Sequence, residues 1–370
     1  GENSSLVCAV TAQGTLRTGE TARLLQADSG ALGVQLTISR PVQRAVEAVA
    51  ASTMTSGCIL VLDTATAAVR ASVSVPCYDP ENLADSLQAE NSPFLNRALQ
   101  SYAVGSVFKP VLAAAALEAG LQPVFECTGA VVVDGQIFRC AGGVPHGQVD
   151  LAAALEKSCN GYFIRLGQQL GAESLLDAAK AFGFGQSLPL AEGLAAEAGQ
   201  LPAPQELAQS GQLANFSFGQ GSLLAAPMQV AALFNTIAAD GVYRSPYVLQ
   251  ATLDETTGQP VETLSHPRGR RVISAQNAAL LRAMLVQVVQ QGTAQDAAGL
   301  SGGAGGKTGT AQTGQFTPEG TERCNLWFAG FWPAEKPRYT IVVLQDGAVH
   351  TAYSGAAIFA QVCNALEAAG

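Results

Sequence analysis

The sequence predicts an α/β fold of the α+β type, in which one mostly antiparallel sheet carries a large helical insertion. Two observations support this prediction. Short apolar runs typical of strands occur toward both ends of the chain, whereas the middle, approximately residues 76–270, is dominated by Ala- and Leu-rich segments with helical spacing. Strands that share one sheet must therefore come from distant parts of the chain. A cleft between the sheet and the insertion is the natural place for a ligand.

The first elements follow a stretch, residues 1–33, that is rich in Gly, Thr and Ala and only weakly periodic. Ser39 and Pro41 are suited to the start of a helix, as N-cap and first-turn residue. Two apolar runs around the sequence DTATA indicate a hairpin. We expect a short strand over 34–38, a helix over 40–51, and strands over 57–62 and 69–75.

The middle and the end of the chain show the opposite order, helices first and strands afterwards. The spacing of apolar residues predicts helices over 111–119, 151–170, 174–182, 227–239 and 274–291. A cluster of glycines then leads into the sequence KTGTAQT, which opens a strand. Further strands are expected over 326–332 and 338–345, and a closing helix over 355–369.

Composition excludes several classes of protein. The chain has 370 residues, 48% of them hydrophobic and 13% charged, which excludes a disordered chain. The formal net charge of −9 argues against a general affinity for nucleic acid or anionic lipid. No apolar run approaches the ~18 residues that span a bilayer, and the first ten residues lack the basic start and apolar stretch of a secretory signal.

The eight cysteines contain no C-x-x-C pair, which disfavours a zinc ribbon or a thioredoxin-type redox centre. Cys127 and Cys140 bracket an apolar run that is broken by Asp134-Gly135, so a hairpin would bring their sulfur atoms together. A disulfide and a pair of free core thiols both fit this pattern. His146 is expected to be a structural loop residue, and the sequence predicts no metal and no cofactor.

A possible nucleophile stands in the sequence GSVFKP, where Ser106 and Lys109 are separated by three positions just before a helix. Residues i and i+3 share one helix face, so the hydroxyl and the amine come within reach of each other. Pro110 places Ser106 at the helix N-terminus, where backbone N–H groups favour a developing alkoxide. Lys109 can act as the base only when it is neutral, so the site should contain a second cation that lowers its pKa.

Two further motifs supply suitable groups. Ser158 and Asn160, inside the predicted helix 151–170, offer a hydroxyl for proton relay and an amide. Lys307 opens the strand after the glycine cluster and is the candidate second cation, while Gly309 would let another backbone approach closely. An extended peptide can add to such a strand through main-chain hydrogen bonds.

The three motifs, Ser-x-x-Lys, Ser-x-Asn and Lys-Thr-Gly in this order, match the set found in penicillin-binding proteins and serine β-lactamases. The chain resembles a class B penicillin-binding protein from about Val34 to its end. The stretches SVPCYDPEN, GVPHG, SFGQG, QQGTA and WFAGFWP also look like this family. The resemblance implies an antiparallel five-stranded sheet flanked by helices, with a helical subdomain inserted over approximately 76–270.

The resemblance also implies a mechanism and a set of site residues. Ser106 would attack the bond between the two terminal D-alanines of a peptidoglycan stem peptide, with Lys109 as base. Ser158 and Asn160 would act as proton relay and substrate anchor. Lys307 and Thr308 would bind the substrate carboxylate and tune Lys109, and Thr308, Gly309 and Thr310 would bind the substrate. The backbone N–H groups of Ser106 and Thr310 would form the oxyanion hole. A β-lactam antibiotic would acylate Ser106 and remain bound.

For the whole protein, the resemblance implies a membrane anchor, action on the extracytoplasmic face of the bacterial cytoplasmic membrane, and a glycosyltransferase or other cell-wall synthesis partner. The expected domains are a remnant of an N-terminal pedestal region over 1–33 and a transpeptidase domain over 34–370. Cys159, inside the second motif, is expected to be a packed thiol.

The motifs also allow other classes of protein. A serine β-lactamase needs a water-activating loop, and the closest match, Glu173 to Asp177, begins only 15 residues after Ser158. A β-lactam sensor without catalytic activity shares the three motifs. The sequence GLSGG around Ser301 matches a G-x-S-x-G nucleophile elbow, with Asp346 and His350 downstream, but lacks the strand before it and the helix after it. A phosphate-binding P-loop would need glycine at position 301.

Overall fold

A computed structural model of the chain describes residues 4–7, 23–26, 32–89, 91–266 and 268–369. The chain forms two compact units. One consists of residues 1–37 and 249–266, and the other of residues 38–248 and 267–370. Every candidate site residue named above belongs to the second unit.

The first unit is built from strands. A three-stranded sheet has the order β16-β15-β3, and β1 pairs with β2. These strands are β1 (Ser4–Val7), β2 (Arg23–Gln26), β3 (Leu32–Leu36), β15 (Leu249–Asp254) and β16 (Pro260–Thr263). The strand predicted over 34–38 is β3, shifted by two residues at each end. Most of residues 1–33 lie outside the described residues, so the pedestal remnant stays a prediction.

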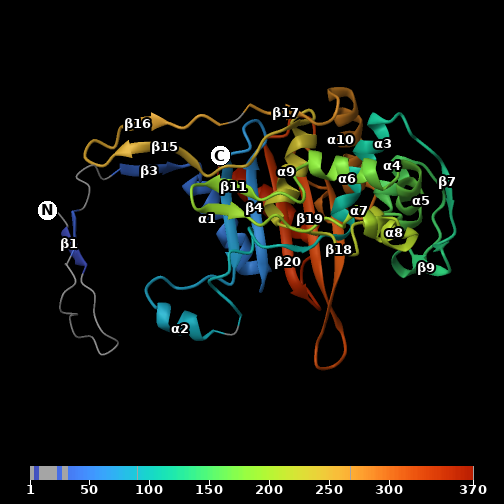
Figure 1. Cartoon of the computed structure of the whole chain (residues 1–370), viewed down its shortest axis with the longest axis horizontal. Coiled ribbons are helices and arrows are strands. Elements are labelled where there is room, and N and C mark those ends of the chain that lie inside the picture. The colour runs from blue at the N-terminus through green and yellow to red at the C-terminus, as the bar shows by residue number, and fades with distance from the viewer. Residues whose placement is uncertain (1–3, 8–22, 27–31, 90, 267, 370) are drawn as a thin grey trace. The chain divides into compact units, whose positions relative to one another are not determined.

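The centre of the second unit is a five-stranded antiparallel sheet (Figure 1). Its order is β18-β19-β20-β4-β5, so strands from both ends of the chain lie side by side, as predicted. The strands are β4 (Gly57–Asp63), β5 (Val69–Val75), β18 (Gly305–Phe316), β19 (Glu322–Trp332) and β20 (Tyr339–Ala348). β18 forms an edge of the sheet. This edge leaves main-chain groups of β18 without a neighbouring strand.

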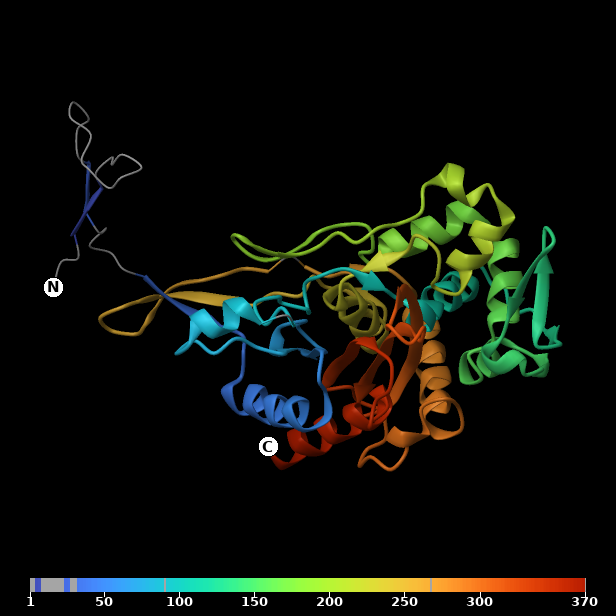
Figure 2. The same ribbon diagram turned by 90° about the horizontal axis from the view of Figure 1, so that it is seen from below.

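Helices cover both faces of this sheet. The helices α1 (Arg40–Thr53) and α11 (Gly355–Ala368) lie side by side on one face, as Figure 2 shows for the blue and red helices. On that face the rings of Phe328 and Phe359 pack with their centroids 4.7 Å apart. The helix α9 (Pro227–Ala238) packs on β4, β19 and β20, where Thr340 donates a hydrogen bond to Asn235. All residues of α9 are buried.

The helical region packs beyond the edge strand β18 (Figure 1). Its main helices are α3 (Lys109–Glu118), α4 (Leu151–Glu156), α5 (Asn160–Leu170), α6 (Ala172–Ala181), α8 (Ser210–Ser217) and α10 (Ala275–Gln290). α3 is apolar on every side, and it is buried because α4, α5, α6 and α10 surround it. Among the described residues, no helix is both long and apolar enough to cross a membrane.

The remaining elements are short. They are α2 (Leu83–Gln88), β6 (Tyr102–Ala103), the 3-10 helix η1 (Gly105–Phe108), β7 (Phe125–Cys127), β8 (Ala130–Val133), β9 (Gln136–Arg139), η2 (Ala141–Gly143), β10 (Gly147–Val149), β11 (Leu188–Ala191), β12 (Leu194–Ala196), α7 (Pro204–Leu207), β13 (Leu224–Ala225), β14 (Val242–Tyr243), β17 (Arg270–Arg271) and η3 (Gln295–Ala297). The hairpin predicted at Asp134-Gly135 is confirmed as β8 and β9. Both turn residues have positive φ, +47° and +79°.

The prediction of one continuous helix over 151–170 is wrong. The structure has two helices, α4 and α5, that are separated at Ser158, where φ is +52°. Few residues other than glycine adopt this left-handed conformation, so it must be imposed by the surroundings. Cys159 then caps α5, with its sulfur accepting a hydrogen bond from the N–H of Tyr162 at 3.4 Å.

Candidate active site

Ser106 lies in the 3-10 turn η1, directly before α3, and Lys109 is the first residue of α3. Pro110 occupies the first turn of that helix, as its missing N–H predicts. Ser106 is partly exposed and lines a pocket, whereas Lys109 is fully buried. The chain therefore presents the hydroxyl to ligands and encloses the amine in the protein.

Two glycines let η1 press against the strand β18. A Cβ atom on Gly105, which has φ of +65°, would lie 2.7 Å from the carbonyl oxygen of Thr310. A Cβ atom on Gly309 would lie 3.1 Å from the backbone nitrogen of Val107. Any larger residue would force the two backbones apart. The prediction that Gly309 permits a close backbone approach is confirmed, and Ser106 and Thr310 are neighbours as a result.

Lys109 connects the first motif to the second. Its Nζ lies 2.7 Å from Asn160 Oδ1, 2.8 Å from the carbonyl oxygen of Ser158 and 3.1 Å from Ser158 Oγ. Among the described residues, Lys109 Nζ forms no hydrogen bond with Ser106 Oγ. The three contacts with the second motif occupy the amine instead.

The surroundings of Lys109 favour its neutral form. Burial lowers the pKa of Lys109 to about 7, and the nearby thiols of Cys159 and Cys140 oppose this shift only in part. Among the described residues, no carboxylate forms an ion pair with Lys109. A large fraction of Lys109 is thus unprotonated near neutral pH, which is the state that a general base requires.

Lys307 of β18 is the second buried amine, and its Nζ donates a hydrogen bond to the carbonyl oxygen of Thr308 at 3.2 Å. Burial first, and then repulsion by Lys109, hold the pKa of Lys307 well below its usual range. Burial, not Lys307, is what lowers the pKa of Lys109. The sequence-based expectation was that Lys307 lowers the pKa of Lys109, whereas burial is the main cause of that shift.

The amide of Asn160 is fixed from both sides. Its oxygen accepts the hydrogen bond from Lys109, and its Nδ2 donates to the carbonyl oxygen of Arg139 at 2.9 Å. Arg139 ends β9, so the hairpin β8–β9 supports the second motif. No local sequence pattern indicates this contact, because the two residues are 21 positions apart.

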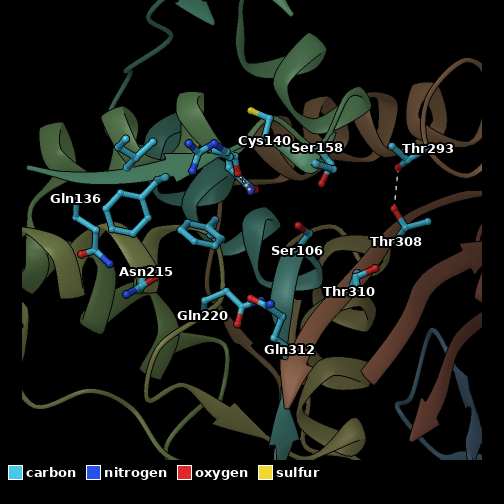
Figure 3. Close-up of a pocket in the computed structure, with 17 residues that line it drawn as sticks. Ser106, Gln136, Cys140, Ser158, Asn215, Gln220, Thr293, Thr308, Thr310 and Gln312 are labelled. Carbon is cyan, nitrogen blue, oxygen red and sulfur yellow. Dashed lines mark hydrogen bonds between the residues drawn. The ribbon is translucent and has the colours of Figure 1, made fainter. Parts of the chain in front are cut away.

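The three motifs border one pocket with a volume of about 680 Å³. Along β18, Thr308, Thr310 and Gln312 point toward it and the backbone of Gly309 also lines it, while the side chains of Lys307 and Ala311 are buried. Figure 3 shows Ser106, Ser158, Thr308 and Thr310 around this space. Further lining residues that sequence reasoning did not single out are Gln136, Ile137, Phe138, Arg139, Ala141, Asn215, Phe218, Gln220, Thr293 and Gln312.

Thr293 was missed although it belongs to the stretch QQGTA that carried part of the resemblance. Its hydroxyl lies 2.7 Å from the hydroxyl of Thr308, the contact that is dashed in Figure 3. Thr293 thereby orients a side chain of the third motif toward the pocket.

The alternative nucleophile Ser301 has no such surroundings. Its carbonyl oxygen accepts a hydrogen bond from Trp332 Nε1 at 2.7 Å, at the end of the sheet where β19 finishes. Asp346 lies near the opposite end of β20 and pairs with Arg97, with 3.3 Å between Arg97 Nε and Asp346 Oδ2. His350 is exposed. The nucleophile elbow is not assembled.

Comparisons with known proteins agree with this architecture. The family model described as penicillin binding protein transpeptidase domain matches residues 57–366. The chain is 32% identical over 364 residues to peptidoglycan D,D-transpeptidase PbpA of Mycolicibacterium smegmatis, a match that covers 91% of this chain and 72% of that relative.

Solved structures are similar as well. The ceftriaxone acyl-enzyme complex of penicillin-binding protein A from M. tuberculosis has a TM-score of 0.81 at 28% identity, covering 92% of this chain and 80% of that one. A D,D-transpeptidase domain from Eggerthella lenta shares the fold, with a TM-score of 0.82 at 24% identity, covering 99% of this chain and 96% of that one.

The fold and the family match define a penicillin-binding transpeptidase domain. The chain belongs to the penicillin-binding protein transpeptidase family, and its relatives include class B members. It is an enzyme of the peptidoglycan D,D-transpeptidase class.

Proposed function

We propose that this protein cross-links peptidoglycan stem peptides, and that the reaction passes through an acyl-enzyme on Ser106. The observation that carries the proposal is the position of Lys109. A buried amine that is partly neutral at pH 7 follows the candidate nucleophile by three residues and is hydrogen-bonded to Ser158 and Asn160. This arrangement supplies a base where a serine hydroxyl needs one.

In the acylation step, Ser106 Oγ attacks the carbonyl carbon of the penultimate D-alanine, and its proton passes to Lys109 Nζ. The peptide C–N bond then breaks, and the leaving amine of the terminal D-alanine takes a proton from Lys109 through the Ser158 hydroxyl. The Nζ of Lys109 lies 3.1 Å from Ser158 Oγ, which is within range for this relay.

The strand β18 would hold the substrate. An extended peptide can pair with this edge of the sheet, with its terminal carboxylate beside Thr308 and Lys307. Binding of the carboxylate would raise the pKa of Lys307 and draw a proton onto it. The backbone N–H groups of Ser106 and Thr310 would stabilise the oxyanion, and such a donor typically contributes ~3 to 4 kcal/mol to lowering the barrier.

In the second step, the amine of another stem peptide attacks the ester carbonyl, which forms the cross-link and frees Ser106. A β-lactam would form the same ester with Ser106 but lacks a leaving group that departs, so the ester would persist. The acyl-enzyme complexes of M. tuberculosis penicillin-binding protein A, which has the same fold, support this part of the proposal.

The proposal also covers location and partners. Because the substrate is peptidoglycan, we infer that the domain works on the extracytoplasmic face of the cytoplasmic membrane, anchored there in the full-length protein. A glycosyltransferase that makes the glycan strands would be the partner whose product this domain consumes.

A peptide assay tests the proposal. The purified protein is given a stem-peptide analogue that ends in D-Ala-D-Ala, with and without an acceptor amine, and the released D-alanine and the transferred product are measured. We expect both with the wild-type protein, no reaction with a D-Ala-L-Ala analogue, and a loss of at least ~1000-fold for Ser106→Ala. Rapid turnover of nitrocefin without any peptide transfer would indicate a β-lactamase and would overturn the proposal.

A further inference from the structure

Three cysteines and one histidine gather next to the second motif. Cys127 ends β7, Cys140 follows β9, His146 precedes β10 and Cys159 caps α5. Their ligand atoms, three Sγ and one imidazole nitrogen, all lie within 4.8 Å of one another. Within the described parts of the chain, no other group of three or more His, Cys, Asp or Glu side chains comes together in this way.

The distances fit a tetrahedral metal. The sulfur of Cys140 lies 3.6 Å from that of Cys127 and 3.8 Å from that of Cys159. His146 Nδ1 lies 3.4 Å from Cys127 Sγ. Zn–S bonds of about 2.3 Å place two sulfur ligands about 3.8 Å apart in a tetrahedron, and a sulfur and a nitrogen ligand about 3.5 Å apart. A disulfide would require about 2.05 Å.

The donor set selects the metal. Three thiolates and an imidazole are the ligands of structural zinc sites, whereas Mg²⁺ and Ca²⁺ prefer oxygen. The three cysteines are at most 5% exposed, and His146 is partly exposed. Four protein ligands would fill the coordination sphere and leave no position for a reacting water, which is typical of a structural site.

The backbone around the cluster is also suited to thiolates. The N–H of Tyr162 donates to Cys159 Sγ at 3.4 Å, and the N–H groups of Asn160 and Gly161 donate to Cys140. These donors form the first turn of α5, whose N-terminus favours negative charge. The backbone N–H of His146 donates a hydrogen bond to the carbonyl oxygen of Cys127 at 3.0 Å and so holds this residue in place.

We propose that Cys127, Cys140, His146 and Cys159 bind one Zn²⁺ ion, and that this ion holds the second motif in its catalytic position. The three thiols release their protons to solvent on binding, and His146 binds as neutral imidazole, so the loaded site has a net charge of −1. Ser158 and Asn160 flank the ligand Cys159, so the ion would fix both of them against the hairpin β8–β9. The positioning role rests on the proposed function, whereas zinc binding does not.

The sequence did not reveal this site. The ligands are spaced C-x12-C-x5-H-x12-C, which matches no short zinc motif, and Cys159 is hidden inside a catalytic motif. Only the folding of β7, the hairpin and the break at Ser158 brings the four side chains together.

Metal analysis tests zinc binding directly. The protein is purified with a phosphine reductant and without chelators, and zinc is measured by elemental mass spectrometry. We expect about one zinc ion per chain in the wild type, a loss of most of it in Cys127→Ala and Cys159→Ala, and unchanged zinc in the control Cys363→Ala, which removes a buried thiol elsewhere. Replacement by Co²⁺ should give the visible absorption of a tetrahedral cobalt thiolate.

The positioning role is tested on the wild-type protein, so that a variant that fails to fold does not obscure the result. Removal of zinc by a chelator should slow labelling by a fluorescent penicillin at least ~tenfold, and added Zn²⁺ should restore the rate. Unchanged labelling after zinc removal would overturn the positioning role.

Two results would overturn the site itself: a disulfide between any two of Cys127, Cys140 and Cys159 under native conditions, or three free thiols with no metal bound after Zn²⁺ is added. The two proposals fail separately. Zinc without Ser106-dependent labelling would remove the proposed function alone, and Ser106-dependent labelling without zinc would remove the metal site alone.

Discussion

Lys109 Nζ lies 2.7 Å from the side-chain oxygen of Asn160, and this contact joins the helix that starts beside the candidate nucleophile to the helix that starts with the second motif. The two residues are 51 positions apart in the sequence. Because Lys109 is buried without an acidic partner among the described residues, the contact is made by an amine that can lose its proton near neutral pH.

The first prediction concerns pH. Burial lowers the pKa of Lys109 to about 7, so its neutral, basic form increases as the pH rises through that value. We expect the second-order rate constant for acylation by a penicillin to rise with pH, with a midpoint near 7, and to level off above it. Stopped-flow fluorescence with a labelled penicillin measures the profile. A flat profile between pH 5 and 9 would exclude Lys109 as the base.

A Lys307 variant provides a comparison for this pH profile. Burial, and not Lys307, lowers the pKa of Lys109, so removing the Lys307 amine should not move that pKa. Lys307→Gln should therefore weaken penicillin binding and leave the pH midpoint in place. A clear shift of the midpoint would show that Lys307 acts on Lys109 after all.

The second prediction concerns a negative charge introduced at position 160. In Asn160→Asp, a carboxylate would replace the amide oxygen beside the Lys109 amine, and an opposite charge at this distance raises the pKa of the amine. We expect acylation at pH 7 to fall by ~10-fold or more and to recover in part at pH 9. The pH profile of this variant is the measurement. Equal losses at both pH values would mean that the change acts on structure alone.

The sequence predicts an element correctly where the residues that determine it are neighbours in the chain. Pro41, Pro110 and the turn Asp134-Gly135 act within a few residues, and the elements that they predict are present. The break at Ser158 was missed because Ala- and Leu-rich helical spacing continues on both sides of it. Ser158, with its left-handed backbone, accepts a hydrogen bond from Lys109, 49 positions away, and no local pattern records this contact.

The site also contains residues that the sequence predicts and residues that only the fold brings together. Its motif residues could be predicted because their order and spacing are distinctive, and the structure brings Ser106, Lys109, Ser158, Asn160 and Lys307 into one region. Thr293 had a signal in the stretch QQGTA, whereas the lining residues of β9 could not be predicted, because their relation to the site is purely spatial. The same holds for the pKa of Lys109, whose main cause is burial.

The third prediction concerns the close contact between η1 and β18. In Gly309→Ala, the new Cβ atom would lie 3.0 Å from Val107 Cγ1 and 3.1 Å from the Val107 nitrogen. Relieving this overlap would move Ser106 away from Thr310, at a cost of about 1 to 3 kcal/mol in folding free energy. We expect acylation to slow at least ~10-fold. Thermal unfolding and labelling rates measure the two effects.

Gly299→Ala is the matched control, because a Cβ atom there meets no atom within 4 Å. Both variants exchange glycine for alanine in the same part of the chain. If Gly299→Ala were impaired as much as Gly309→Ala, the close approach would not be the cause.

The fourth prediction concerns Thr293. Thr293→Val removes the hydroxyl that lies 2.7 Å from the hydroxyl of Thr308 and keeps the shape of the side chain. A hydrogen bond of this kind contributes about 0.5 to 1.5 kcal/mol, so we expect KM for a stem-peptide analogue to rise ~2- to 10-fold while kcat changes little. Steady-state kinetics beside Thr351→Val, an exposed threonine outside the pocket, provide the comparison. A loss in kcat alone would contradict substrate positioning by Thr308.

Peptide mapping by mass spectrometry, after brief exposure to a penicillin, asks most directly whether Ser106 is the nucleophile. We expect a single adduct of the mass of the intact antibiotic on the peptide that contains Ser106, none in Ser106→Ala, and full labelling in Ser301→Ala, which removes the competing serine. An adduct on any other residue, or labelling that persists in Ser106→Ala, would contradict the mechanism.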